Sequence, residues 1–198
     1  MNDAENRLFM IIAHERQLIW QFAQEVEDVL GILPGIEMGD KHVSLKAQPP
    51  IVVSCRPTLM AQKPATEEQF GQLCAAGVER PGLVTDAIAR RCINAIQNGQ
   101  DLADIQQAID EHNASWKCDH ERGTVSRIHK FDPLANDWLL IFDEAHKHAY
   151  SLPTVRHIVD HFDRNPNTRR IGITATPKRS LNSSIGSKMF PHSAMDYP

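Results

Sequence analysis

Four short runs of largely apolar residues, without polar alternation, stand out along the chain. Continuous apolar runs of this length are typical of strands that are buried on both faces. Helix-like amphipathic stretches lie between several of them. Because buried strands that alternate with helices form parallel sheets covered on both faces, the pattern predicts an α/β fold. The four runs are LFMIIA at 8–13, IVVS at 51–54, LLIFD at 139–143 and RIGITAT at 170–176.

Two helices are predicted beside these strands. After the first run, apolar residues recur at helical spacing until Gly31 and Pro34, which are typical of a helix end. A second amphipathic stretch precedes the last run. The segment IEMGDKHVSLKAQPP, at 36–50, is expected to be a polar connection. The apolar positions of the first helix are Leu18, Ile19, Phe22, Val26 and Leu30, and those of the second are Val155, Ile158, Val159 and Phe162.

The region from Met60 to about Lys130 has a different pattern, with three stretches of helical spacing. Thr66 and Gln69 have the spacing of a capping box, and Asp101 can cap another helix. The region therefore predicts a helical insertion set between two strands of the sheet. Its apolar helix positions are Phe70, Leu73 and Cys74, then Val84, Ile88, Cys92 and Ile96 before Asn98-Gly99, and then Leu102, Ile105 and Ile109.

Composition narrows the class of protein. The 198 residues are 41% hydrophobic and 23% charged, as in ordinary globular proteins. The net charge of −4 gives no overall attraction to nucleic acid, so any such contact must come from local patches. The four cysteines form no CxxC pair, and the chain has neither a long apolar run nor a signal-peptide pattern. A cytoplasmic location without membrane contact is expected.

Polar residues that could bind a ligand or take part in catalysis stand at the ends of two of the predicted strands. In open parallel sheets, ligands bind beyond the carboxyl ends of the strands. Asp143 and Glu144 stand at one such end, and Thr174 and Thr176 at another. An aspartate directly after a strand can hold Mg²⁺ through water, and a neighbouring glutamate can polarise a water molecule. The alternative for an isolated Asp-Glu pair is a helix N-terminus, where acids favour the helix dipole.

DEAH after one strand and TATP after the next form a more specific combination. With them, the chain resembles the first, RecA-like lobe of superfamily 2 DEAD/DEAH-type helicases. Within that superfamily it is most similar to the bacterial branch of the type III restriction enzyme Res-subunit helicase. The resemblance covers residues 7–59 and 127–198. It rests on LFMIIAHERQLIWQF for motif Ia, GIEMGD after it, IVVSCRPTL for motif Ib, FDPLANDWLLIFDEAHKHA for motif II, RRIGITATPKR for motif III, and IGSKMFPHSAMDYP after motif III.

The resemblance implies ATP and Mg²⁺ as cofactors and gives roles to five residues. Asp143 would bind the Mg²⁺ of Mg-ATP through water, and Glu144 would be the general base for the hydrolytic water. His146 would relay the state of the nucleotide toward motif III. Thr174 and Thr176, at the nucleotide site, would couple it to the bound strand. The implied activity is ATP hydrolysis coupled to movement on nucleic acid.

In the family, motifs Ia and Ib contact the nucleic-acid backbone. The resemblance therefore implicates His14, Arg16, Arg56 and Thr58, with DNA as the expected partner and RNA as the alternative. Such side chains are suited to sequence-independent binding of the phosphates of the nucleic-acid backbone. Two simpler interpretations remain open, because His14 could close the end of a strand and Arg56 could be a surface charge. Pro57 also removes a backbone donor from motif Ib.

The sequence also departs from the family pattern. No G-x-x-x-x-G-K-[ST] loop for phosphates precedes motif Ia, and Gly186-Ser187-Lys188 has Leu181 where the first glycine should be. A second lobe is missing too. We therefore expect a fragment: an incomplete RecA-like parallel sheet flanked by helices, with a helical insertion. It should have an open apolar edge, low stability and little ATPase activity alone. The missing P-loop segment and second lobe, in another chain, would then be partners.

Three domains are predicted, and two other functions stay open. Residues 1–60 would be the first part of the ATP-binding lobe, 61–126 the insertion and 127–198 the second part of the lobe. The first alternative is a non-catalytic module, derived from a helicase lobe, that binds a partner or nucleic acid. The second is a metal site in the insertion, formed by Cys92, Cys118, His112 and His120, since Cys and His suit zinc.

Overall fold

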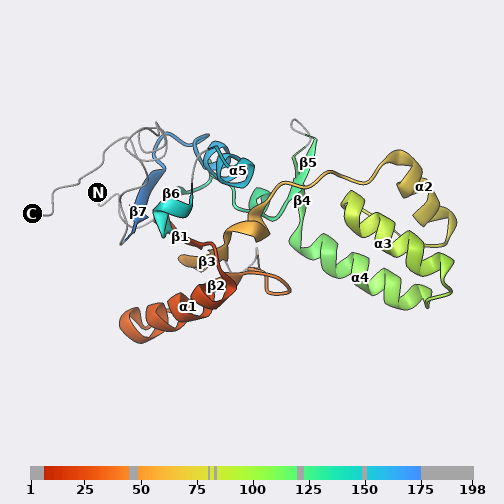
Figure 1. Cartoon of the computed structure of the whole chain (residues 1–198), viewed down its shortest axis with the longest axis horizontal. Helices are drawn as coiled ribbons and strands as arrows, with labels where there is room; N and C mark the ends of the chain where they lie inside the picture. Colours follow the sequence, from red (N-terminus) through yellow and green to blue (C-terminus); the bar gives the residue numbers. More distant parts are fainter. Residues whose placement is uncertain are drawn as a thin grey trace, which may run out of the picture. The chain divides into compact units, whose positions relative to one another are not determined.

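The computed structural model describes residues 7–44, 49–79, 81–82, 84–119, 123–148 and 151–174. The chain divides into two compact units (Figure 1). Unit 1 comprises Met1–Met60 and Asp132–Pro198, and unit 2 comprises Ala61–Phe131. None of the helices among the described residues is long and apolar enough to cross a bilayer.

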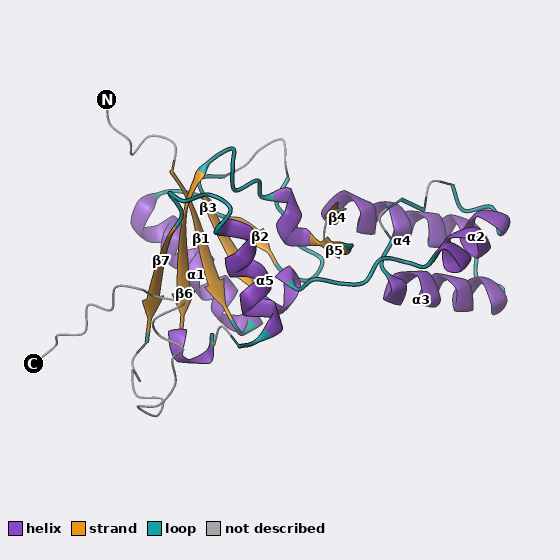
Figure 2. Ribbon diagram, turned by 90° about the horizontal axis from the view of Figure 1, so that it is seen from above, coloured by secondary structure: helices purple, strands orange, loops and turns teal. Residues whose placement is uncertain are grey.

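Unit 1 contains a five-stranded sheet in which all described strand pairs are parallel. An α/β fold with a RecA-like parallel sheet is thereby confirmed. Figure 2 shows the strands side by side, in the order β2-β3-β1-β6-β7. The four predicted apolar runs correspond to four of them. The strands are β1 (Arg7–Ala13), β2 (Gly35–Glu37), β3 (Ile51–Cys55), β6 (Asp137–Asp143) and β7 (Arg169–Ile173).

Helices α1 (Arg16–Leu30) and α5 (Pro153–Phe162) pack on opposite faces of this sheet. Alternate side chains of a strand point to opposite faces. On one face, Val53 of β3 belongs to a buried cluster with Ile19 of α1. On the other face, Trp138 of β6 is fully buried, and its ring lies 5.1 Å from that of Phe162 of α5. Both predicted helices of this unit are confirmed.

Strand β7 is the edge of the sheet on the side away from β2. Its sequence is that of a buried strand, yet Ile171 and Ile173 are 46% and 56% exposed. The sheet is therefore well covered at its centre and much less at β7. Exposed apolar edge strands tend to pair with other chains.

The loops before β6 and after α5 are joined by a buried asparagine. The Nδ2 of Asn165 donates to the main-chain oxygens of Pro133 and Asn136, at 2.8 and 3.1 Å. It also lies 3.1 Å from Oδ1 of Asp137. A single amide thus satisfies several acceptors where the chain enters β6, which fixes the start of the strand that ends in DEAH.

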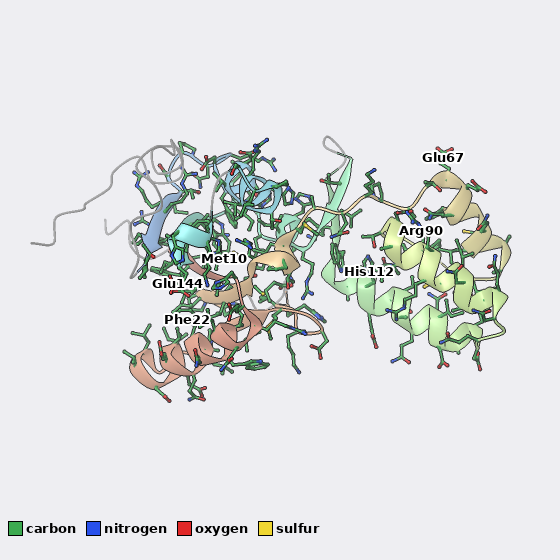
Figure 3. The ribbon with its side chains drawn as sticks, viewed as in Figure 1. Met10, Phe22, Glu67, Arg90, His112 and Glu144 are labelled. Carbon is green, nitrogen blue, oxygen red and sulfur yellow. The ribbon has the colours of Figure 1, made fainter. Side chains whose placement is uncertain are left out.

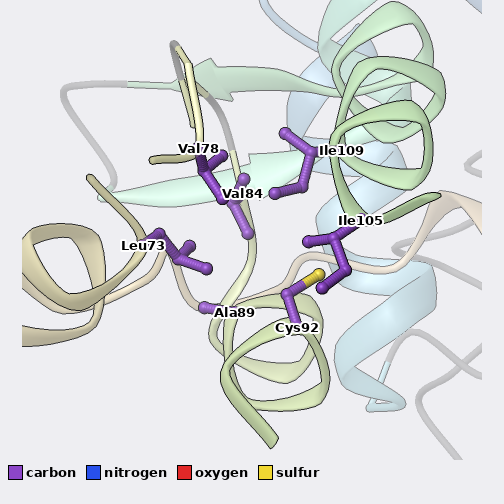
Figure 4. Close-up of a cluster of buried hydrophobic side chains, with 7 residues drawn as sticks. All are labelled: Leu73, Val78, Val84, Ala89, Cys92, Ile105 and Ile109. Carbon is purple, nitrogen blue, oxygen red and sulfur yellow. The ribbon is translucent and has the colours of Figure 1, made fainter. Parts of the chain in front are cut away.

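Unit 2 has a small hydrophobic core of its own. Helices α2 (Glu67–Ala75), α3 (Asp86–Gln97) and α4 (Leu102–Ser115) form it together with the segment between α2 and α3. The predicted capping box at Thr66 and a side-chain cap at Asp101 are present. Figure 4 shows its seven buried residues, which are Leu73, Val78, Val84, Ala89, Cys92, Ile105 and Ile109.

The sequence pattern missed three short strands. β2 overlaps the start of the stretch 36–50, which was expected to be a polar connection. In unit 2, β4 (Lys117–Asp119) and β5 (Thr124–Ser126) form an antiparallel hairpin in a region that was expected to be helical. Each of these strands has three residues, which is too short for a two-residue period to be visible. β2 forms because it pairs with β3 at Gly35↔Val52.

Candidate nucleotide site and its neighbouring loops

The polar residues of interest gather where parallel strands end. β1, β3, β6 and β7 run in the same direction, so their carboxyl ends share one edge of the sheet. His14 follows β1, Arg56 follows β3, the 3₁₀ turn η3 (Ala145–Lys147) follows β6, and Thr174 follows β7. Figure 3 shows the labelled Glu144 side chain in this region. The topology thus collects segments that are distant in the sequence.

Asp143 is the last residue of β6 and is half-buried. Burial raises the pKa of its carboxyl, and the negative charge of the adjacent Glu144 adds to this effect. The nearby positive charge of Lys147 acts in the opposite direction. A bound cation would stabilise the ionised form of this partly buried carboxyl group, which makes Asp143 a good candidate for a metal ligand.

Glu144 adopts a left-handed backbone conformation, with φ 51° and ψ 53°. Among the described residues it is the only one with positive φ that is not glycine. Its main-chain oxygen accepts a hydrogen bond of 2.7 Å from the N–H of Lys147, which closes the turn η3. Such conformations persist where surrounding contacts maintain them, and they are frequent at functional sites.

His146 joins this turn to the end of β7. Its Nδ1 lies 3.0 Å from Oε2 of Glu144 and 2.7 Å from Oγ1 of Thr174. The hydroxyl of Thr174 is also 3.4 Å from the same carboxylate oxygen. The structure therefore brings three of the predicted site residues, Glu144, His146 and Thr174, into contact. Asp143 is the neighbour of Glu144 in the sequence. The remaining one, Thr176, lies outside the described residues.

Of the residues suggested for nucleic-acid contact, two face the turn after β6. His14 Nε2 is 2.7 Å from Nζ of Lys147 and 2.8 Å from Oε1 of Glu15. The Nη1 of Arg56, in the 3₁₀ helix η1 (Arg56–Leu59), donates to the main-chain oxygen of Lys147 at 2.7 Å. Lys147 thus contacts both loops, a role that its place in the sequence did not predict.

The other two suggested residues lie nearer the solvent. Arg16 is exposed at the start of α1, and its guanidinium group lies against the α-carbon of Gly39. A side chain at position 39 would require the end of the Arg16 side chain to move. Gly39 also has a φ of 57°, which glycine adopts without strain. Thr58 is half-buried in η1.

His148, which follows Lys147, is a second residue whose environment the sequence did not predict. It is fully buried, and neither ring nitrogen has a hydrogen-bond partner in the described part of the chain. Its ring lies edge-on to Phe142, with centroids 5.3 Å apart. Burial lowers the pKa of His148 to about 4, and the charge of Arg56 adds to this effect. The imidazole is therefore neutral at ordinary pH.

This histidine should make unit 1 sensitive to acid. In the unfolded chain its pKa returns to about 6.5, so the unfolded state binds more protons between that value and about 4. The free energy of unfolding is therefore unaffected by this histidine above pH 6.5. It falls by on the order of 2–3 kcal/mol as the pH falls toward 4. We expect His148→Phe to reduce this loss, as measured by urea unfolding at pH 7.5 and pH 5. The exposed His42→Phe serves as control, and an unchanged acid loss in His148→Phe would contradict the prediction.

A bound zinc ion needs several Cys, His, Asp or Glu side chains close together. No group of three such side chains among the described residues could hold an ion. For the zinc alternative, Cys92 lies in the core of unit 2, His112 stacks on Trp116, and His120 lies outside the described residues. Two adjacent carboxylates at a strand end do fit Mg²⁺, which takes few protein ligands and keeps several waters.

Comparison with known proteins gives one result. A protein-family model described as "Type III restriction enzyme, res subunit" matches residues 1–179. This match includes residues 61–126, which lie outside the resemblance based on the motifs. It does not include residues 180–198, which that resemblance covered. Among curated proteins the sequence has no match.

Proposed function

Because the chain belongs to the type III restriction enzyme res subunit family, we propose that unit 1 is the ATP-binding lobe of an ATP-dependent DNA helicase or translocase. The family is one of helicase-like, ATP-dependent enzymes that act on nucleic acid. The finer assignment, to hydrolysis at Asp143 and Glu144, is our own.

The observation that carries this proposal is the contact of His146 with both Glu144 and Thr174. It joins the ends of β6 and β7, which are adjacent in the sheet. A change in the position of the Glu144 carboxylate would therefore change the contacts of Thr174, through His146. This is the connection expected if ATP hydrolysis is coupled to movement.

The roles follow from position. Asp143 would hold Mg²⁺ through water, because β6 fixes its direction and burial favours a cation beside it. Glu144 would accept the proton of the attacking water, since its carboxylate follows directly and is 34% exposed. When bound, Mg-ATP supplies the phosphoanhydride bond that is cleaved and the divalent charge that neutralises its oxygens. Thr174 and Thr176 complete the proposed site.

We further propose that nucleic acid binds along the loops after β1 and β3, with DNA favoured over RNA. His14, Arg16, Arg56 and Thr58 are the proposed contacts, because they lie at the same edge of the sheet as the nucleotide site. Residues 61–126, within unit 2, would be an insertion in the lobe formed by 1–60 and 127–198. A cytoplasmic location remains part of the proposal.

The test is binding of ATP by the purified chain. We expect saturable binding that requires Mg²⁺ and that Asp143→Ala weakens by about tenfold or more, because the proposed cation ligand is removed. Isothermal titration with a non-hydrolysable ATP analogue measures the affinity. Asp28→Ala, an exposed carboxylate on α1, is the matched control. Binding that is equal in Asp143→Ala would contradict the proposal and favour the non-catalytic module. Absent binding would contradict a working nucleotide site in this chain alone and favour the expected fragment.

A further inference from the structure

An arginine from a distant loop holds the turn that carries Glu144. Nη1 of Arg56 donates to the main-chain oxygen of Lys147 at 2.7 Å, across 91 positions of sequence. Lys147 is the last residue of η3, where a helical carbonyl has no partner within its own helix. The charge of the guanidinium group strengthens this hydrogen bond. Arg56 therefore supplies the contact that the end of the turn lacks.

The turn needs such contacts because its first residue is in an unfavourable conformation. Glu144 has a φ of 51°, which side chains with a β-carbon rarely adopt. Inside the turn, the N–H of Lys147 donates to Glu144, and the N–H of His148 donates to Ala145 at 3.0 Å. These are two short-range hydrogen bonds in a short element. The bond from Arg56 ties the turn to η1, and thus to the end of β3.

Arg56 also stands in a segment that we propose to face nucleic acid. Its guanidinium group is half-buried and has a neutral carbonyl as acceptor. A phosphate carries negative charge and matches the two-pronged geometry of a guanidinium group, so it is the stronger acceptor. A phosphate that reaches η1 would compete with Lys147 for the same side chain.

The side chain of Lys147 leads to the other loop. Its Nζ lies 2.7 Å from Nε2 of His14 and 3.9 Å from Oε1 of Glu15. Lys147 is thus bound through its main chain to the loop after β3, and through its side chain to the loop after β1. Both loops that we propose for nucleic acid meet at one residue, three positions after Glu144.

We propose that Arg56 is a positioning residue, which holds the turn of Glu144 through Lys147 until nucleic acid draws the arginine away. The inference rests on the proposed function and adds a route of regulation to it. In the free protein, Arg56 keeps Glu144 in its left-handed conformation. A backbone phosphate at η1 takes the guanidinium group, loosens the turn and lets Glu144 change its orientation.

Hydrogen exchange, followed by mass spectrometry, tests this inference on the peptide that contains the amides of Lys147 and His148. In the free chain, Arg56→Gln should speed exchange of these amides by about tenfold, because a charge-assisted hydrogen bond is lost. A dT20 oligonucleotide at low salt should speed exchange in the wild-type chain and have no further effect in Arg56→Gln. Arg56→Lys keeps the positive charge but lacks the planar guanidinium group, so its exchange rates should lie between those of the wild type and Arg56→Gln.

The control is Arg164→Gln, an exposed arginine after α5, which should exchange and respond to dT20 as the wild type does. Circular dichroism verifies that each variant is folded. Unchanged exchange in Arg56→Gln, slower exchange with dT20, or no binding of dT20 would each overturn the inference. If Mg²⁺-dependent ATP binding persists in that case, the proposed nucleotide site stands without this coupling. If ATP binding is absent while exchange behaves as expected, the proposed function fails and the tie between the loops stands.

Discussion

Glu144→Gln is expected to slow hydrolysis of ATP by about 10²–10⁴-fold, because glutamine cannot accept a proton from the attacking water. Glutamine has nearly the same shape, so it can keep the left-handed turn and the contacts with His146 and Thr174. Affinity for the nucleotide should therefore change little. Single-turnover measurements with the chain in excess over radiolabelled ATP give the rate even when turnover is slow.

Glu25→Gln is the matched control, since Glu25 is exposed on α1, away from the strand ends. It should hydrolyse ATP at the wild-type rate. Two results would contradict the role of Glu144 as general base. One is a rate in Glu144→Gln within a few-fold of the wild type, and the other is a loss of rate that is fully explained by weaker nucleotide binding.

Trp138→Ala is expected to lower the free energy of unfolding of unit 1 by about 3–5 kcal/mol. Trp138 is fully buried near the start of β6 and packs on Phe162, with ring centroids 5.1 Å apart. Its Nε1 donates to the main-chain oxygen of Asp132 at 3.3 Å. Alanine would leave a large cavity between β6 and α5, and it would leave that oxygen without its donor. Urea unfolding followed by circular dichroism measures the loss.

Trp138→Phe separates the two contributions. Phenylalanine retains most of the ring packing and loses the hydrogen bond, so we expect a smaller loss, of about 1–2 kcal/mol. Trp20→Ala is the control, because Trp20 is 50% exposed on α1. A loss in Trp138→Ala no larger than that in Trp20→Ala would mean that the packing of α5 on the sheet contributes little to stability.

Much of the fold could be predicted from the sequence, for physical reasons. The runs at 8–13, 51–54 and 139–143 are short and almost continuously apolar, which is typical of strands buried on both faces. The apolar period of α1 and the capping box at Thr66 act locally, so they are visible without knowledge of the fold. Asp143, Glu144 and Thr174 could be selected because they stand at the carboxyl ends of the runs 139–143 and 170–176.

Other features depend on partners that are far away in the chain. Strand β2 has too few residues to show a period, and it exists because β3 offers it hydrogen bonds. The fully buried His148 looks like any other polar residue near DEAH, yet Phe142 and the surrounding core exclude water from it. Its lowered pKa is a consequence of that burial.

The sequence by itself determined the four longer strands and the helices, because apolar runs, apolar periods and caps act over a few residues, whereas the short strand β2 depends on its distant partner β3. Only the tertiary structure decided which polar side chains meet at the strand ends. Arg56 and Lys147 are brought together because β3, β1 and β6 are neighbouring parallel strands, whose carboxyl ends share one edge. The turn that follows the left-handed Glu144 likewise contacts residues that follow three different strands, through Lys147 and His146.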